Sequence, residues 1–366
     1  MLFRSNWLHR IGKKIVEKLE RQTTVEDRWR GHTVKVVDGS GLSMPDTLEN
    51  QNVYPQPSGQ KPGCGFPVMH IVALFSLATG AILRVERDRM KTAERPMFRR
   101  MWDALQSGDV VLADTGFTSF ADFFLLKQRG VDCVMRNHQR RSTGAHTIKK
   151  LGRRDKLVLW EKTGSCPQWL TPDAWEAMPN EMIVRQIDVQ VDIPGFRTQQ
   201  IDIVTTLLDA KKYPAIEFAD LYRRRWLAEI FLRDIKISMN MDVLKCKTPV
   251  MVEKELEMYI IAYNLIRALI FKAAKKHGVD ATRISFKSTC DALRQWLPVL
   301  IANGHHDAQM IDILIHYIAQ FIIPFRPNRT EPRAIKRRQK NYQRMTKPRR
   351  QFKESMHRNH YSKCLC

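Results

Sequence analysis

The chain has 366 residues, of which 61 are Lys or Arg and 38 are Asp or Glu, so its formal net charge is +23. This length exceeds that of one small domain, and the charge is typical of proteins that bind polyanions, with nucleic acid as the leading partner. The sequence lacks an uninterrupted apolar run of about 20 residues, a secretory signal and a cysteine spacing typical of disulfide frameworks or zinc sites, which predicts a reduced, intracellular protein without a membrane span.

The first 45 residues predict one helix and one strand. A short amphipathic helix is expected in the basic segment 1–30, because apolar residues recur there at every fourth position: Trp7, Ile11, Ile15 and Leu19. A β-branched run then ends at Asp38, directly before Gly39, which predicts a strand that enters a turn at this point. The stretch 46–67 is rich in Pro, Gly, Gln and Asn and predicts a long loop.

The next segment predicts a hairpin and a strand-helix-strand unit. Strands are expected over 69–80 and 81–88, joined through Gly80, followed by a helix over 92–106. The run 108–117 has the same pattern as the run that ends at Asp38: an apolar strand, Asp114 at its carboxyl end and a glycine turn. A helix over 119–130 and a strand over 131–136 complete the unit.

From about residue 137 to 208 the pattern changes to basic turns and β-patterned pieces, which indicates a β-rich insertion. Helices are expected again after Pro214, and then near 249–276, 287–303 and 307–322. Residues 326–363 form a basic tail with 14 Lys or Arg against two Glu. We expect this tail to bind nucleic acid, the alternative being a solvated tail that serves solubility.

Residues 221–236, LYRRRWLAEIFLRDIK, place a carboxylate among arginines in an otherwise apolar helix. At about 100° per residue, five polar side chains fall within an arc of about 80°: Tyr222, Arg225, Glu229, Arg233 and Lys236. We expect this stripe to face a cleft or a partner, while the apolar remainder is buried on several sides. The alternative is that Arg225 and Arg233 form ordinary surface pairs with Glu229, each contributing roughly 0.2 to 0.5 kcal/mol.

Asp38 and Asp114 are both predicted to lie where α/β folds place functional groups, at the carboxyl ends of strands. Either one alone would more often be a turn residue. Other acids compete for the role. Asp109 precedes its strand and Asp202 lies within one, so Asp88 is the remaining, minor rival.

A cluster formed by Asp38, Asp114 and Glu229 would need cations. At an effective dielectric near 20, each pair of charges about 5 Å apart costs about 3 kcal/mol. Two Mg²⁺ ions with oxygen ligands could offset this repulsion and support an in-line phosphoryl transfer. The neighbouring arginines would then hold DNA phosphates rather than neutralise the glutamate.

The spacing of Tyr222, Arg225, Glu229 and Lys236 resembles the Y-x2-R-x3-E-x6-K signature of DDE transposases encoded by bacterial insertion sequences, in particular the insertion sequence 4 family. VVDGSGLSMPD and LADTGF resemble the two aspartate motifs of that family, in the same order. Residues 246–269 and 331–349 resemble its downstream segments, so the resemblance covers roughly residues 25 to 350.

The resemblance implies a ribonuclease-H-like α/β domain, a mixed sheet flanked by helices, over residues 31–325. This domain would contain the β-rich insertion at about 137–208 and the C-terminal helices at about 249–322. A basic helical remnant, 1–30, would precede it, and the basic tail, 326–366, would follow.

The resemblance also implies roles for the stripe and the two aspartates. Asp38, Asp114 and Glu229 would be the catalytic residues and would bind two Mg²⁺ ions, with Mn²⁺ as a substitute. Three residues match positions that grip DNA near the cleaved end: Tyr222, Arg225 and Lys236. Arg233 is added to this DNA-binding set from helical geometry alone.

The implied activity is metal-dependent cleavage of double-stranded DNA at transposon ends, followed by transfer of the freed 3′-hydroxyl into target DNA. A homodimer in a synaptic complex, in the bacterial cytoplasm at the nucleoid, would carry it out. Some family members form a hairpin intermediate and stack a flipped base on an aromatic ring. Trp160 and Trp169 are the candidates for base stacking here, and the alternative for each is a packing role.

The segment ahead of the first aspartate departs from the family pattern. Family members generally carry a helical end-recognition domain there, whereas 37 residues precede Asp38 in this sequence. We therefore expect an N-terminally truncated chain. The alternative functions are a catalytically silent DNA-binding regulator or inhibitor of the full-length transposase, and a stand-alone structure-specific nuclease.

Overall fold

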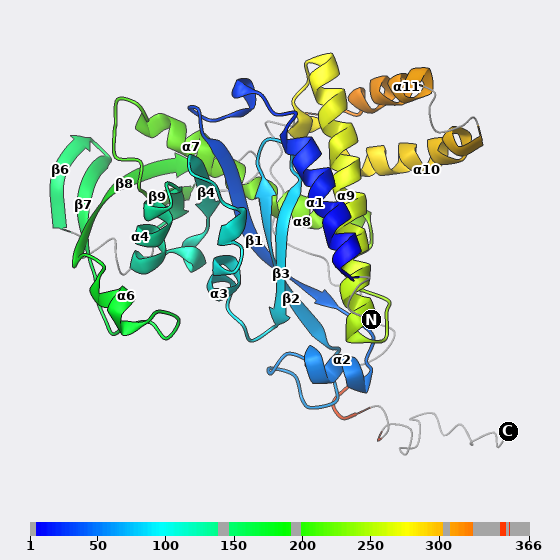
Figure 1. The fold of residues 1–366 in the computed structure, drawn as a ribbon, viewed down its shortest axis with the longest axis horizontal. Helices are drawn as coiled ribbons and strands as arrows, with labels where there is room; N and C mark the ends of the chain where they lie inside the picture. Colours follow the sequence, from blue (N-terminus) through cyan, green and yellow to red (C-terminus); the bar gives the residue numbers. More distant parts are fainter. Residues whose placement is uncertain are drawn as a thin grey trace.

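The computed structural model describes residues 5–137, 146–191, 199–302, 308–324, 345–348 and 351. Its centre is one nine-stranded sheet with the order β3-β2-β1-β4-β5-β9-β8-β7-β6 (Figure 1). The first five strands are β1 (Thr33–Ser43), β2 (Val68–Ser76), β3 (Ile82–Arg89), β4 (Asp109–Ala113) and β5 (Asp132–Arg136). The remaining four are β6 (His146–Gly152), β7 (Asp155–Glu161), β8 (Glu181–Val191) and β9 (Gln199–Thr205).

The first five strands form the core of the sheet. β1, β4 and β5 are parallel to one another, whereas β2 runs antiparallel to both β1 and β3. A mixed five-stranded order 3-2-1-4-5 with one reversed strand is the ribonuclease-H-like arrangement, so the predicted fold class is confirmed. β9 pairs antiparallel with β5, and therefore the strands within residues 137–208 continue the same sheet.

Helices cover both faces of the sheet. The described helices of the first half are α1 (Ser5–Glu20), α2 (Leu48–Val53), α3 (Glu94–Arg99), α4 (Phe120–Gln128) and α6 (Pro172–Glu176). Those of the second half are α7 (Ala215–Arg223), α8 (Leu227–Arg233), α9 (Pro249–His277), α10 (Phe286–Ala302) and α11 (Ala308–Ala319). The long helix α9 runs beside α1, and α10 and α11 extend away from the sheet (Figure 1).

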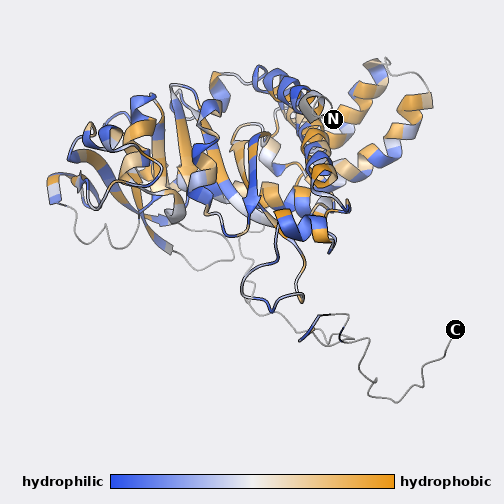
Figure 2. Ribbon diagram, turned by 60° about the horizontal axis from the view of Figure 1, so that its bottom comes forward, coloured by the Kyte–Doolittle hydropathy of each residue, from blue (hydrophilic) through white to orange (hydrophobic). Residues whose placement is uncertain are grey.

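The alternation of side chains along β1 explains the two cores. Val34, Val36 and Leu42 are buried on the face that α7, α8 and α9 cover, whereas Val37 is buried on the face that α3 and α4 cover. This follows from the period of two along a strand. Figure 2 shows hydrophobic residues running along the strands between these helices, as a sheet buried on both faces requires.

Most expected elements are present. The hairpin through Gly80 is formed by β2 and β3, and Gly80 adopts a left-handed φ of 70°, a conformation that favours glycine. The expected strand-helix-strand unit is formed by β4, α4 and β5, and the four C-terminal helical stretches coincide with α7–α8, α9, α10 and α11. In the described part of the chain, no helix is both long enough and apolar enough to cross a membrane.

Three expectations were wrong in detail. β1 does not end at Asp38 but continues to Ser43, because β2 goes on pairing with it from Asp38↔Ala73 to Ser43↔Val68. The stretch 46–67 contains α2, whose first turn is capped by the Thr47 side chain. The segment expected to hold basic turns contains the strand β6. The basic tail lies outside the described residues, except for 345–348 and 351.

Arg185 of β8 forms a buried ion pair with Asp155 of β7 and also contacts the segment before α7. Its side chain is fully buried and donates to both carboxylate oxygens of Asp155, at 2.7 and 2.5 Å. A third hydrogen bond, at 2.7 Å, reaches the Tyr213 carbonyl oxygen. All three nitrogens of the guanidinium therefore have an oxygen partner.

We expect Asp155→Ala to lower the free energy of unfolding by about 3 to 5 kcal/mol, because it leaves a buried guanidinium without its carboxylate. Urea unfolding at pH 7 measures the change. The control is Asp291→Ala, which removes exposed pairs with Lys287 and Arg294. Equal losses in the two variants would show that burial of the Arg185–Asp155 pair does not matter.

Candidate catalytic site

The polar stripe of 221–236 lies on an almost continuous right-handed helix. α7 passes into a 3-10 turn, Arg224–Trp226, then into α8, and finally into a π-helical turn, Asp234–Ser238. The residues at these junctions all have right-handed helical backbone angles. The expected single helix is therefore present, with one tight turn and one wide turn, and π turns often occur at functional sites.

Asp38 points toward this helix because of its place in β1. It has the same parity as Val36 and Leu42, whose side chains are buried against the helical layer, and Ser40 shares that parity. Lys236 donates from Nζ to Ser40 Oγ at 2.8 Å and to the Gly41 carbonyl oxygen at 3.0 Å, which ties the end of the helix to β1.

Asp38 and Glu229 meet at one small cavity. Its volume is about 310 Å³, and its polar lining comes from β1 and from the helix: Asp38, Ser40, Glu229, Arg233 and Lys236. Four of the five are residues that the sequence singled out. Glu229, Arg233 and Lys236 of the stripe therefore face a hollow against the central strand, whereas Tyr222 and Arg225 do not line it.

Asp114 lies at the end of the neighbouring strand. The parallel pairing of β1 and β4 ends at Val36↔Leu112. Asp38 follows two residues later within β1, and Asp114 directly follows Ala113, the last residue of β4, so both acids lie beyond the same end of the paired segment. Asp114 caps a 3-10 turn and accepts a hydrogen bond from the Gly116 amide at 2.8 Å.

Tyr222 lies next to Asp114 rather than in the cavity. Its hydroxyl donates to the Ala113 carbonyl oxygen at 3.4 Å, and its side chain is buried. Burial raises the pKa of Tyr222 to about 12, with Asp114 acting in the same direction and Arg225 opposing it. Tyr222 is therefore a neutral hydrogen-bonding group beside the second aspartate.

Burial dominates the electrostatics of Asp38. It raises the pKa of Asp38 to about 6, and the carboxylates of Glu229 and Glu94 push in the same direction. A hydrogen bond from the Gly39 amide and the charge of Arg225 oppose the rise. The cavity therefore carries a partly desolvated negative charge that a cation would stabilise.

Glu229 is paired with Arg225 in this structure, at 2.8 Å between Nη2 and Oε1. The alternative of an ordinary pair four residues apart therefore describes Arg225 in this structure. The same alternative does not describe Arg233. Its side chain is 63% exposed, and its ion pair is a loose one with Asp234 at 3.9 Å.

The carboxylate oxygens of Asp38, Asp114 and Glu229 are suitable ligands for a hard divalent ion, but the three side chains do not surround a common point. Among the described residues, no group of three or more Asp, Glu, His or Cys side chains is close enough to bind a metal ion. Each acid instead has a local donor: Gly39 N for Asp38, Gly116 N for Asp114 and Arg225 for Glu229. Carboxylate oxygens are nevertheless the ligands that Mg²⁺ prefers, and Asp38 and Glu229 already share a cavity.

Sequence reasoning missed Glu94, the first residue of α3. Its carboxylate lies directly over Gly39 on the opposite face of β1, where any Cβ at position 39 would overlap with it. His70 Nε2 is 3.5 Å from Glu94 Oε1, and His70 Nδ1 is 2.8 Å from the Thr92 carbonyl oxygen. The glycine after Asp38 therefore makes room for a carboxylate instead of a turn, and a glycine within a β-branched run is the sequence sign of such a close approach.

The other acids are engaged elsewhere. Asp88 pairs with Arg100 at 2.8 Å, and Asp109, the first residue of β4, forms a buried pair with Lys35 at 2.5 Å. Of the two tryptophans, Trp160 is 3% exposed and packs against Phe123, so the packing alternative describes it. Trp169 is 39% exposed, and the Arg99 guanidinium lies 3.8 Å from its ring centre.

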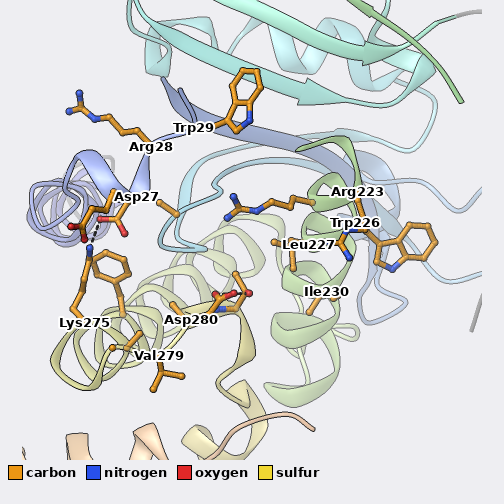
Figure 3. A pocket seen from close by; sticks show the side chains of 18 residues that line it. Asp27, Arg28, Trp29, Arg223, Trp226, Leu227, Ile230, Lys275, Val279 and Asp280 are labelled. Atoms are coloured by element: carbon orange, nitrogen blue, oxygen red, sulfur yellow. Dashed lines mark hydrogen bonds and ion pairs between the residues drawn. The ribbon is translucent and has the colours of Figure 1, made fainter. Parts of the chain in front are cut away.

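A larger cavity, of about 830 Å³, borders the same helix (Figure 3). Arg223, Trp226, Leu227 and Ile230 line it from the helix, and the ion pair between Lys275 and Asp27, 2.7 Å long, lies at another wall. Asp38, Asp114 and Glu229 do not line this cavity. One side of the helix therefore faces Asp38 at the smaller cavity, and another side faces the larger cavity, which both charged and apolar residues line.

Comparison with known proteins gives a family match. The family model described as "Transposase DDE domain" matches residues 29–265, a range that includes Asp38, Asp114 and Glu229. The chain is 25% identical over 346 residues to the transposase InsG for insertion sequence element IS4 of Escherichia coli (strain K12), covering 91% of this chain and 76% of that protein.

Two further similarities are more limited. The chain is 35% identical over 88 residues to a probable transposase for insertion sequence element IS5377 of Geobacillus stearothermophilus, covering 24% of this chain and 22% of that protein. A solved structure of the piggyBac transposase synaptic complex with hairpin DNA aligns at a TM-score of 0.42 and 9% identity, covering 81% of this chain and 58% of that one. Because the family model spans more than half of the chain, this protein belongs to the DDE-domain transposases, and InsG of insertion sequence element IS4 is one of its relatives.

Proposed function

We propose that this protein cleaves double-stranded DNA at transposon ends and transfers the freed 3′-hydroxyl into target DNA, with Asp38, Asp114 and Glu229 as its catalytic residues. The observation that carries the proposal is the meeting of Asp38 and Glu229, far apart in the chain, at one cavity, with Asp114 on the adjacent strand. The relation to a transposase of an insertion sequence element supports the same activity.

The three carboxylates would hold two divalent ions, Mg²⁺ or Mn²⁺. When bound, such ions activate the attacking oxygen and stabilise the leaving oxygen of an in-line phosphoryl transfer. The residues of this chain supply the rest. The partly buried Asp38 provides a charge whose repulsion with Glu229 favours cation binding, and β1 and the helix hold the two acids on rigid elements.

The cations of the stripe have two roles in this proposal. Arg233, which is exposed at the cavity, would contact a DNA phosphate, and Lys236 would keep the helix on β1 while adding positive charge. Arg225 neutralises Glu229 in the metal-free protein and would turn to a phosphate once ions take its place. Joining two transposon ends needs two such sites, so we propose a homodimer in a synaptic complex.

We expect Asp38→Asn, Asp114→Asn and Glu229→Gln each to lower Mg²⁺-dependent cleavage of transposon-end DNA by more than about 100-fold, because each removes charge from the proposed ion site. Binding of the same DNA in a gel-shift assay should change little. Asp88→Asn is the matched control and should cleave normally, because Asp88 pairs with Arg100 outside the cavity. Retained cleavage in any of the three variants would remove that residue from the site.

We expect Arg233→Ala to weaken DNA binding and to reduce the slope of log affinity against log salt by about 1, as loss of one phosphate contact does. Arg294→Ala is the matched control, because the Arg294 side chain is 64% exposed and lies on α10. Titration of labelled DNA at several salt concentrations measures both. An unchanged slope in Arg233→Ala would contradict the proposed contact.

Asp38→Asn should also stabilise the metal-free protein at neutral pH. The folded-state pKa of Asp38, about 6, lies above its ordinary value of 3.8, so ionisation opposes folding. The penalty is absent below about pH 4, grows between about pH 4 and 6, and approaches about 3 kcal/mol above that range. Urea unfolding in EDTA across this range measures it.

The control for this measurement has the opposite sign. Burial would raise the pKa of Asp88, but hydrogen bonds from the Arg89 amide and from Arg100 outweigh it and lower that pKa. Asp88→Asn should therefore lose stability at neutral pH relative to the parent protein, a loss that fades as the pH falls through the folded-state pKa of Asp88. Stabilisation by both variants would point to a general effect of removing negative charge.

A further inference from the structure

The β6–β7 hairpin carries a group of cations at the end of the sheet. Four of them line a cavity of about 670 Å³: Lys150, Arg153, Arg154 and Lys156. Lys149 is exposed next to them on β6. None of these five side chains forms an ion pair with another residue in the described part of the chain. The hairpin lies at the opposite end of the molecule from α10 and α11 (Figure 1).

These cations do not stabilise the hairpin. The register places Lys150 directly opposite Lys156, and like charges in this position repel each other. Arg153 and Arg154 lie in the turn between the two strands and add two more positive charges close by. Cations that repel one another at the surface are the electrostatic pattern of a site that binds a polyanion.

The acids of the same cavity do not cancel this charge. Asp155 is paired with Arg185 in the interior. Asp188 and Asp202 each keep one carboxylate oxygen buried, and amide side chains donate to the other oxygen: Gln200 to Asp188, and Asn137 and Gln186 to Asp202. Four cations therefore stand against these two acids, and three of the four are exposed to solvent.

The strand register connects the hairpin to the end of β4, beside Asp114. One row of paired residues crosses the sheet from the last residue of β4 to β6: Ala113, Met135, Val204, Gln186, Lys156 and Lys150. Asp114 directly follows Ala113. At about 4.8 Å per strand, Lys156 lies about 19 Å and Lys150 about 24 Å from Ala113, measured along the sheet.

We propose that the β6–β7 hairpin binds the phosphates of the same DNA duplex whose cleaved bond lies at Asp114, with four cations as the contacts: Lys150, Arg153, Arg154 and Lys156. At about 3.4 Å per base pair, the path along the sheet corresponds to about six or seven base pairs of duplex. Phosphate contacts of this kind fix the position of the duplex and carry no sequence information. The inference rests on the proposed function, because the cleaved bond is its reference point.

Binding of a labelled duplex of arbitrary sequence, several helical turns long, tests the contact in EDTA, where no cleavage is needed. We expect Arg153→Gln/Arg154→Gln to reduce the slope of log affinity against log salt by about 2, because two phosphate contacts are lost. Arg153→Lys/Arg154→Lys keeps both charges and should keep the parent slope. The matched control, Lys287→Gln/Arg294→Gln, removes two exposed charges of α10 and should also keep it.

Two results of this titration would overturn the proposal. An unchanged slope in Arg153→Gln/Arg154→Gln would show that the cations only protect β6, the last strand of the sheet, from pairing with other chains. An equal loss of slope in Arg153→Lys/Arg154→Lys would show that the side chains act through the fold of the turn and not through their charge. Thermal unfolding of each variant should give the parent Tm, because both arginines are exposed.

A second measurement locates the contact on the duplex. Transposon-end duplexes are shortened on one side or the other of the bond that the parent protein cleaves. We expect the affinity difference between Arg153→Gln/Arg154→Gln and the parent protein to vanish once one arm is shorter than about six base pairs, because that duplex no longer reaches the hairpin. A difference that ignores both arm lengths would overturn the shared duplex. A parent protein that cleaves no DNA would refute the proposed function, while the salt slope in EDTA would still decide whether the hairpin binds DNA.

Discussion

The packing of one helix against the central strand determines what this molecule can do. β1 is held on both sides by β2 and β4, and α8 lies across the face from which Asp38 projects. Lys236 fastens the end of that helix to Ser40 and Gly41 of the same strand. As a result, Glu229 reaches Asp38 although nearly 200 residues separate them, and the charge of Asp38 is moved partly out of water.

The partly buried negative charge of Asp38 explains why cationic side chains lie around the cavity. Arg225 stabilises Glu229 directly through their ion pair; burial would lower the pKa of Arg225, but the hydrogen bond to Glu229 outweighs this effect and raises that pKa. Arg233 remains exposed at the rim of the same cavity. In this structure local donors hold the three acids: Gly39 N for Asp38, Gly116 N for Asp114 and Arg225 for Glu229.

The second half of the sheet, β6 to β9, also buries charged side chains. β9 joins β5, so the strands of residues 137–208 are continuous with the five-stranded core of the sheet. Among the described residues of this half, Arg185 and Asp155 form a buried pair, whereas Asp188 and Asp202 each keep one carboxylate oxygen without a hydrogen-bond donor. Both arrangements lie among apolar strands, where an unpaired charge is more costly than in water.

The sequence by itself determined the kinds of elements and the fold class, and it singled out Asp38, Glu229, Arg233 and Lys236, which line one cavity. Local patterns sufficed for this: the apolar strand before Asp114, the glycine at the β2–β3 turn, and the spacing of Tyr222, Arg225, Glu229 and Lys236. Tertiary structure alone decided that β1 continues past Asp38, because its pairing with β2 is non-local. It also decided that Glu94 occupies the space over Gly39, that Arg225 pairs with Glu229, and that Asp202 faces Asp188. Each of these depends on which distant segment lies opposite, and no local pattern of residues carries that information.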